Sequence, residues 1–163
     1  MSRKAVIAVV GSGKDNAAEI STARELGRLI AANGWVLITG GRNAGVMRAA
    51  NEGAKEADGL TIGILPNRDA EVSPDVDVAI VTDIGQARNN IIVLSADVVV
   101  ACGVEGAGTA SEVALALKNG KPVILLGASD AAAIFFREIG SGHVESSATP
   151  AAAVELITEI LSR

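Results

Sequence analysis

The sequence predicts an α/β fold, a doubly wound parallel sheet with helices on both faces, from three observations. Of the 163 residues, 49% are hydrophobic but only 2% are aromatic, so the core consists of Val, Ile, Leu and Ala, which suit buried parallel strands. Short apolar runs alternate with segments of helical periodicity, and most of these runs end in glycine, as strand-to-helix turns do. A chain of this length buries one core, which predicts a single domain over residues 1–163.

The apolar runs place the predicted strands along the whole chain. They predict strands at residues 5–10, 35–39, 60–65, 78–81, 97–102 and 122–126, and a short edge strand at residues 143–146. A first helix is expected at residues 15–33, where Gly27 allows close contact with the sheet, and another at residues 130–138. Strands that alternate with helices in this way form parallel sheets with right-handed crossovers.

The other helices are recognised by apolar residues at helical spacing and by their ends. Asp83 followed by Gln86 predicts the cap of the helix after the fourth strand, and Thr149-Pro150 predicts the start of the last helix. The expected buried faces are Met47, Ala50, Ala54 and Ala57; Ala87, Ile91 and Leu94; Ala110, Val113, Ala114 and Leu117; and Val154, Ile157 and Leu161.

The strand order sets where a ligand is expected. In a Rossmann-like sheet the order in which successive strands are added reverses between the first and fourth strands. Ligands bind outside the carboxyl ends of the strands at that point. The longest connection, residues 66–77, is polar and contains Pro66 and Pro74. It is predicted to act as a lid or a binding loop.

Composition excludes several classes of function. The single cysteine, Cys102, allows no intramolecular disulfide, and residues 1–4 lead into a short strand instead of a signal peptide, which predicts a cytoplasmic protein. No apolar run approaches the roughly 18 to 20 residues that cross a bilayer. The net charge of −5 disfavours polymeric nucleic acid as a partner. With Cys102 and a single histidine, His143, far apart in the sequence, no metal site is predicted.

Glycine loops and cations follow the predicted strands, in an otherwise acidic chain. The cations are Lys14, Arg42, Arg68 and Arg88, and the loops are Gly11-Ser12-Gly13, Gly40-Gly41 and Gly106-Ala107-Gly108. Backbone N–H groups and charge-assisted hydrogen bonds at one rim of the sheet would hold a small phosphorylated or otherwise anionic ligand. The alternative is that strand-to-helix loops need glycine in any case and that surface cations are common.

Neither familiar nucleotide fingerprint fits the first glycine loop. Asn16 stands where the dinucleotide signature needs its third glycine, and Asp15 follows Lys14 where a P-loop needs Ser or Thr. The loop therefore predicts neither an NAD site nor a P-loop.

Arg88 and Glu112 form the most suggestive pair, because each lies early in the helix that follows a strand. Neighbouring strands are expected to bring these two helix starts together. A carboxylate and a guanidinium across a sugar phosphate could stabilise an oxocarbenium-like transition state or orient water for N-glycosidic cleavage. The alternative is a structural ion pair that holds two helices together.

Three segments in this order resemble the motifs of the lysine-decarboxylase-like superfamily. They read Gly-Gly-Arg-Asn-Ala-Gly-Val-Met at 40–47, Ala-Arg-Asn at 87–89 and Gly-Ala-Gly-Thr-Ala-Ser-Glu at 106–112, and the resemblance extends from the first strand through about residue 126. Its members include the molybdenum cofactor carrier proteins and the Lonely Guy-type cytokinin phosphoribohydrolases. The lysine-decarboxylase label implies pyridoxal phosphate, for which no lysine motif is found.

The resemblance is closer to the carrier branch than to the hydrolases. The phosphoribohydrolase signature is Pro-Gly-Gly-x-Gly-Thr-x-x-Glu with an upstream Arg-Lys. The residues that match it are Gly106, Gly108, Thr109, Glu112 and Arg88. Val104-Glu105 replaces Pro-Gly, which brings negative charge towards the expected phosphate loop, and Asn89 replaces the lysine. The resemblance thus implies a protein that binds molybdenum cofactor, a phosphorylated pterin, as cargo and forms a homo-oligomer, a dimer or a tetramer.

Three hypotheses follow for the function. The favoured one is a phosphate-binding carrier of molybdenum cofactor with no catalytic cofactor. The second is an enzyme that cleaves the N-glycosidic bond of nucleoside 5′-monophosphates, with Arg88 and Glu112 as catalytic residues. The third is a structural or partner-binding domain. The residues expected to contact the ligand are Gly11, Ser12, Gly13, Gly40, Gly41, Arg42, Arg88, Gly106, Ala107, Gly108, Thr109 and Glu112.

Overall fold

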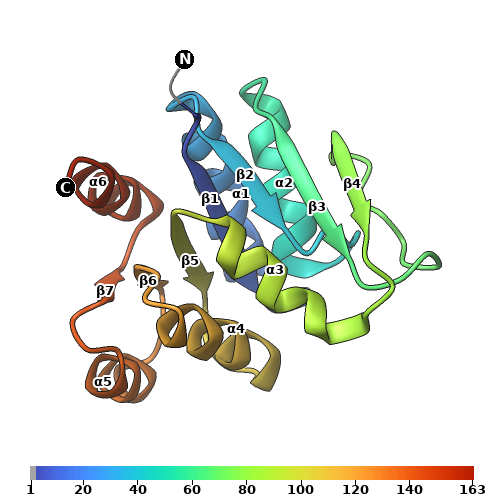
Figure 1. Cartoon of the computed structure of the whole chain (residues 1–163). Helices are drawn as coiled ribbons and strands as arrows, with labels where there is room; N and C mark the ends of the chain where they lie inside the picture. Colours follow the sequence, from blue (N-terminus) through green and yellow to red (C-terminus); the bar gives the residue numbers. More distant parts are fainter. Residues whose placement is uncertain (1–2) are drawn as a thin grey trace.

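The computed structural model describes residues 3–163 and contains one seven-stranded, all-parallel sheet with helices on both faces (Figure 1). This confirms the predicted Rossmann-like α/β fold. Every predicted strand is present, with bounds within one residue of the prediction. The strands are β1 (Val6–Gly11), β2 (Val36–Thr39), β3 (Thr61–Leu65), β4 (Val78–Val81), β5 (Val98–Cys102), β6 (Val123–Leu126) and β7 (Val144–Ser147).

Three of the helices begin at a residue whose side chain caps the helix: Asn16, Ser129 and Thr149. The Asn16 side chain accepts a hydrogen bond of 3.0 Å from the N–H of Ala18, and the Thr149 hydroxyl accepts one of 3.2 Å from Ala152. The helices are α1 (Ala17–Ala32), α2 (Gly45–Glu56), α3 (Arg88–Ser95), α4 (Ala107–Lys118), α5 (Asp130–Ile139) and α6 (Pro150–Leu161), and a short 3₁₀ helix η1 (Gly85–Ala87) precedes α3.

Alternate residues of each strand face two separate apolar cores. In β1, for example, Ile7 and Val9 face one core, whereas Ala8 and Val10 face the other. Helices α1, α2 and α6 cover the first face, and α3, α4 and α5 cover the second. The central strands are therefore buried on both sides, which is why they read as nearly continuous apolar runs, whereas the edge strand β4 is exposed and the edge strand β7 is largely polar.

Gly27 makes a close contact, but with α2 instead of the predicted contact with the sheet. A Cβ atom at Gly27 would overlap the backbone of Ala50, and one at Gly53 would overlap the backbone of Arg24. Helices α1 and α2 thus approach so closely that only glycine fits at both points.

The strand order is β4-β3-β2-β1-β5-β6-β7. The predicted reversal between the first and fourth strands is wrong, because β4 pairs with β3 and extends the first half of the sheet to its edge. The reversal lies between β1 and β5, which are adjacent and parallel. The ligand crevice is therefore expected between the loops that follow β1 and β5.

The start of α3 also differs from the prediction. Asp83 has a φ of 57° and caps no helix, and the chain passes through η1 before α3 begins. The inward residues of α3 are Ile92 and Val93, whereas Ile91 and Leu94 are exposed. The predicted face was thus displaced by about one residue, because it was counted from a helix start that the 3₁₀ turn replaces.

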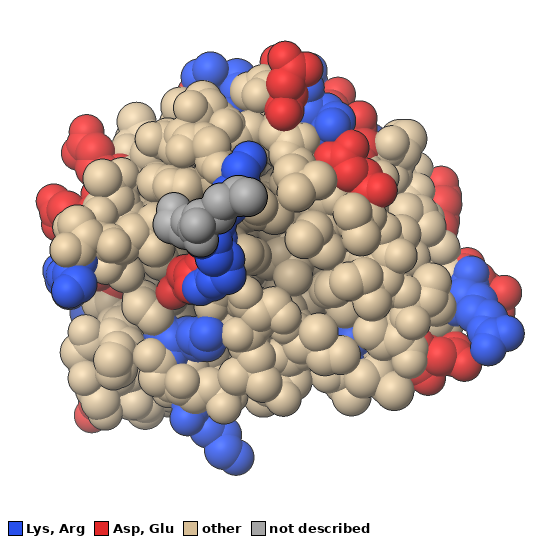
Figure 2. All heavy atoms as spheres, turned by 45° about the horizontal axis from the view of Figure 1, so that its top comes forward, with Lys and Arg blue, Asp and Glu red and all other residues tan. Residues whose placement is uncertain are grey.

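Figure 2 brings forward the end of the molecule at which the strands begin. Lys, Arg, Asp and Glu lie mostly around the margin of this view, often side by side, and uncharged residues fill most of the surface between them. Arg3 and Asp97 form an ion pair of 2.7 Å. Within residues 3–163, no helix has the length and apolar composition to cross a membrane.

Candidate functional site

A cavity of about 330 Å³ opens at the carboxyl ends of β1 and β5, where the strand order reverses. Its wall is formed by the loop after β1, the turn after β2, the start of α3 and the start of α4. We call it the cationic cavity, and its lining residues are Gly11, Ser12, Gly13, Lys14, Arg42, Met47, Gln86, Arg88, Asn89, Gly106, Gly108, Thr109 and Glu112. Three of the four cations predicted at this rim lie here, whereas Arg68 does not.

Arg88 is the most buried cation of the cavity. It is 4% exposed, and its Nη1 donates a hydrogen bond to Oδ1 of Asn89, while its Nε is buried without a partner in the described chain. Burial lowers the pKa of Arg88; Glu112 opposes this effect, and Arg42 adds to it. The guanidinium thus carries free hydrogen-bonding capacity at the edge of the cavity.

Gly40 gives the Arg88 side chain its place, although Gly40 does not line the cavity itself. A Cβ atom at Gly40 would lie 2.6 Å from Sδ of Met47 and 2.9 Å from Nη2 of Arg88. Gly41 has a φ of 73°, and a Cβ there would lie 2.8 Å from Cα of Gly63 in β3. Both glycines of this turn are therefore required by the packing around the site, and their contact with a ligand stays a prediction.

The backbone around Arg42 is held by the second half of the long loop that was predicted to act as a lid. Arg42 forms an isolated antiparallel bridge with Val72. The N–H of Asn43 donates to the carbonyl of Glu71 at 2.8 Å, and the N–H of Ser73 donates to the carbonyl of Gly41 at 2.9 Å. No residue of the loop lines the cationic cavity, so its observed role is to position Arg42.

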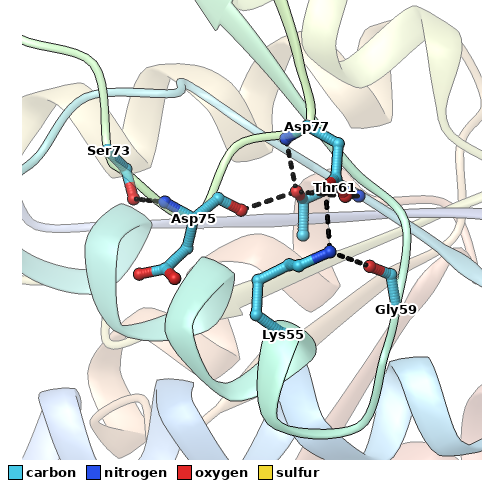
Figure 3. A network of polar contacts seen from close by, with 6 residues as sticks. All are labelled: Lys55, Gly59, Thr61, Ser73, Asp75 and Asp77. Carbon is cyan, nitrogen blue, oxygen red and sulfur yellow. Dashed lines mark hydrogen bonds and ion pairs between the residues drawn. The ribbon is translucent and has the colours of Figure 1, made fainter.

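The end of the same loop is tied to the neighbouring strand and helix (Figure 3). Nζ of Lys55 donates to Asp77 Oδ1 at 2.8 Å and to the carbonyl of Gly59 at 3.2 Å. The Asp77 carboxylate also accepts from the N–H of Thr61 at 2.9 Å, and the Thr61 hydroxyl lies 2.6 Å from the carbonyl of Asp75. Lys55 is the main cause of the lowered pKa of Asp77, and Thr61 adds to it. These contacts anchor the loop beside β3.

The start of α4 leaves its N–H groups free for an anion. Gly106 is the N-cap and supplies no side-chain cap. A Cβ atom at Gly106 or at Gly108 would meet nothing within 4 Å, and neither residue has a positive φ. Packing and backbone conformation therefore do not require glycine at these two positions. The absence of side chains instead keeps the N–H groups of the first helical turn accessible.

The start of α2, by contrast, is already occupied by the protein. The N–H of Val46 donates to the carbonyl of Ser12 at 2.9 Å, and a Cβ atom at Gly45 would overlap the same carbonyl oxygen. The glycine loop after β1 is thus docked on α2. This contact sets the position of Ser12, Gly13 and Lys14 at the cavity wall.

Glu112 is half-buried on the α4 side of the cavity. Burial raises its pKa to about 7, although the positive charge of Arg88 acts in the opposite direction. Within residues 3–163 no ion pair joins Glu112 to Arg88, so the structure does not support a structural ion pair between these residues. A carboxyl group that titrates near neutrality in a cavity is typical of a functional site.

Arg88 and Glu112 meet for a different reason from the one predicted. Strands β4 and β5 are not neighbours, since β3, β2 and β1 lie between them. Instead α3 returns across the sheet and lies beside α4 on the same face (Figure 1). The two residues are brought together by packing of these helices.

Glu105 does not line the cationic cavity. It lines a neighbouring cavity together with Glu19. The predicted negative charge of Glu105 therefore lies at the acidic neighbour of the cationic cavity and not in the wall that contains Arg88.

Three lining residues were not predicted as ligand contacts: Met47, Gln86 and Asn89. Met47 reads as a core residue by its helical spacing, and the structure shows that it is both buried and at the cavity wall. Gln86 and Asn89 lie within two residues of Arg88 in the sequence. This nearness to a predicted ligand contact could have identified them as lining residues. Among residues 3–163, no group of three His, Cys, Asp or Glu side chains could hold a metal ion.

Comparison with known proteins shows the family to which this chain belongs. A profile of the SLOG cluster4 family, LDcluster4, matches residues 4–154. The solved structure of the molybdenum cofactor binding protein from the phototrophic bacterium Rippkaea orientalis is 52% identical, with a TM-score of 0.94 and coverage of 99% of each chain.

Two further relatives agree with this match. The molybdenum cofactor carrier protein of Chlamydomonas reinhardtii is 48% identical, with a TM-score of 0.93 and coverage of 98% of this chain and 100% of that one. An uncharacterized protein from Archaeoglobus fulgidus is 45% identical over 120 residues, which are 74% of this chain and 78% of the relative. The resemblance predicted from the three motifs is thus confirmed.

Proposed function

The chain belongs to the SLOG cluster4 family, and we propose that it is a carrier that binds molybdenum cofactor, with the phosphate of this ligand in the cationic cavity. Two solved relatives with this binding or carrier function match over nearly the full length of both chains at 48% and 52% identity. A match of this extent and level supports the same ligand class for this chain. The cationic cavity supplies the chemistry that the phosphate requires.

One observation carries the proposal more than any other: the cavity has anion-binding groups that the protein itself does not use. The Nε of Arg88 is buried without a partner, and the helix start at Gly106 has no side-chain cap. Arg42 and Lys14 add positive charge in a chain whose net charge is −5. A phosphate would accept hydrogen bonds from the helix start and from the guanidinium, which removes the cost of their burial.

Calorimetric titration of the full chain tests the proposal. We expect molybdenum cofactor to bind, and inorganic phosphate to compete with it for the same site. Gly108→Val tests the helix start, because its side chain enters open space in the free protein and would cover the N–H groups. Ala114→Val, at an exposed position of the same helix that lines neither cavity, serves as the control. Wild-type protein that binds neither probe would contradict the proposal.

The second candidate is hydrolysis of nucleoside 5′-monophosphates, and the state of Glu112 favours it. A carboxyl group with a pKa of about 7 can act as an acid or a base at neutral pH. Arg88 lies in the same cavity and could stabilise charge on a sugar phosphate. Asn89 stands where the hydrolase signature has a lysine, and it accepts a hydrogen bond from Arg88.

Incubation with AMP and with isopentenyl-AMP, followed by chromatography for the free base, tests this second candidate. The hydrolase reading predicts release of base by the wild type and its loss in Glu112→Gln. Binding of these nucleotides without release of base would leave the carrier function as the account of the site.

We also propose that the chain forms a homo-oligomer, as the resemblance implied. The edge strand β4 is exposed along its length although it is apolar, and Val78, Ile80 and Val81 are 44%, 45% and 48% exposed. Ile91 and Leu94 of α3 are exposed as well. Exposed apolar surface at a sheet edge is typical of an interface between subunits. Light scattering of the wild type and of Ile80→Lys measures the mass; a monomeric wild type would contradict this proposal.

A further inference from the structure

A second cavity of about 350 Å³ lies directly beside the cationic cavity. We call it the acidic cavity, and its lining residues are Ser12, Lys14, Asp15, Asn16, Glu19, Cys102, Gly103, Glu105, Gly106 and Thr109. Four of them line both cavities: Ser12, Lys14, Gly106 and Thr109. The two cavities are therefore adjacent, and the loop after β1 and the start of α4 form the wall between them.

The two cavities carry opposite charge. Arg42 and Arg88 line only the cationic cavity, whereas Glu19, Glu105 and Asp15 line only the acidic cavity. A single anion would use only one of the two cavities. A ligand that fills both cavities needs an anionic group at one end and hydrogen-bond donors at the other.

Gly103 leaves room for the Glu19 side chain at the wall of the acidic cavity. Gly103 has a φ of 65°, and a Cβ atom there would lie 2.7 Å from Oε1 of Glu19. The other oxygen, Oε2, is buried and has no hydrogen-bond partner in the described chain. Burial raises the pKa of Glu19, and the nearby charge of Glu105 raises it further. A buried oxygen without a donor is costly unless a ligand supplies one.

Thr109 gives independent support, because it is not part of the acidic cluster. It is 5% exposed, and its hydroxyl forms no hydrogen bond with residues 3–163. It lines both cavities, so its unused hydroxyl is available at the wall between them. Beside it Cys102 is 1% exposed and forms part of the wall of the acidic cavity. Together these residues offer an acceptor, a hydroxyl and an apolar wall to a flat ring.

We propose that the acidic cavity binds the hydrogen-bond-donating edge of a ring system, and that the anionic group of the same ligand binds in the cationic cavity. The edge required has an amino group next to a ring N–H, as in 2-amino-4-oxopteridine, because the Glu19 carboxylate can accept from both. This inference rests on the proposed function and adds to it the orientation of the ligand. The two cavities would read the ring with Glu19 and the phosphate with Arg88.

The size of the acidic cavity favours a ring over a metal ion. A volume of about 350 Å³ is within the range of pockets that hold small organic ligands. Within the described chain no group of three ligating side chains could hold a metal ion. The carboxylates of Glu19 and Glu105 are thus better matched to donors on an organic group.

Fluorescence titration of the full chain with pterin and with lumazine tests the inference. Lumazine has an oxygen in place of the 2-amino group, so it lacks one of the two donors. We expect the wild type to bind pterin at least about tenfold more tightly, the effect of one hydrogen bond to a charged acceptor. Glu19→Gln is expected to remove this preference and to leave the dissociation constant for inorganic phosphate unchanged within about twofold. Glu155→Gln, at an exposed position of α6, is the control.

The outcomes separate this inference from the proposed function. Equal binding of pterin and lumazine by the wild type would overturn the inference while phosphate binding still supported the anion site. A pterin preference that depends on Glu19, without any phosphate binding, would support the ring site in the acidic cavity and overturn the placement of the anionic group in the cationic cavity. A third outcome would also overturn the inference: phosphate binding by the wild type requires Mg²⁺, phosphate binding by Glu19→Gln does not, and the wild type binds pterin and lumazine equally. The carboxylates would then hold a cation and not a ring. The wild-type comparison needs no variant, so it remains decisive if Glu19→Gln does not fold.

Discussion

Replacement of Arg88 by methionine tests the central claim about the cationic cavity. Arg88→Met keeps most of the buried side-chain volume and removes the guanidinium, which is buried and hydrogen-bonded only to Asn89. Because the unliganded charge has no carboxylate partner, we expect the free energy of unfolding to change by less than about 1 kcal/mol. A bound phosphate would lose two charge-assisted hydrogen bonds, about 3 kcal/mol together, or roughly 100-fold in affinity.

Calorimetry with inorganic phosphate and thermal unfolding without ligand measure the two effects separately. Arg137→Met is the control, because Arg137 is exposed on α5 and lines neither cavity. A structural role for Arg88 predicts the opposite pattern from ours. A marked fall in stability together with unchanged phosphate affinity would therefore refute the reasoning.

Four further predictions address the cavity and the packing behind it. Burial raises the pKa of Glu112 to about 7, so the folded state binds the carboxyl proton more tightly than the unfolded state does. The folded state therefore loses stability as pH rises from about 4.5 to 7. Glu112→Gln should for this reason raise the melting temperature at pH 8 more than at pH 5. Sulfate, whose charge is constant in this range, should bind more tightly at pH 6 than at pH 8 in the wild type, and calorimetry of Glu112→Gln should show no such difference. Gly40→Ala places a Cβ 2.9 Å from Nη2 of Arg88, so calorimetry should show a phosphate affinity several-fold weaker than that of the wild type; an unchanged affinity would show that Arg88 does not need this space. Gly53→Ala forces α1 and α2 apart at the Arg24 backbone. It should lower the free energy of unfolding, measured by urea denaturation, by about 2–3 kcal/mol. An unchanged free energy of unfolding would show that the two helices can separate freely.

Local sequence patterns predicted the elements of this fold with small errors. Strands β1 to β6 were recognised within one residue because each is a short apolar run that ends at a glycine or a polar turn, whereas β7 is largely polar. The face of α3 was misjudged because η1 replaces the helix start expected at Asp83. Spacing alone does not show where a 3₁₀ turn precedes a helix.

The candidate site was predicted less completely than the fold. Arg42, Arg88 and the Gly106 loop were found because they follow strands, and parallel strands bring their carboxyl ends to one edge. Met47 was missed because an apolar side chain at helical spacing reads as core. The direction of Glu105 could not be read from the motif, since it depends on how the loop after β5 turns at Gly103.

The sequence by itself determined the parallel α/β fold and the family, and it predicted cations and glycine loops at one rim of the sheet, because periodicity, glycine turns and ordered motifs are local properties. Only the tertiary structure decided that β4 pairs with β3, that α3 brings Arg88 towards Glu112, and that Glu105 lines a second cavity with Glu19. These are contacts between residues far apart in the chain, set by side-chain packing and the path of the connections. The start of α4 thus lies between two adjacent cavities, one lined by Arg42 and Arg88 and the other by Glu19 and Glu105.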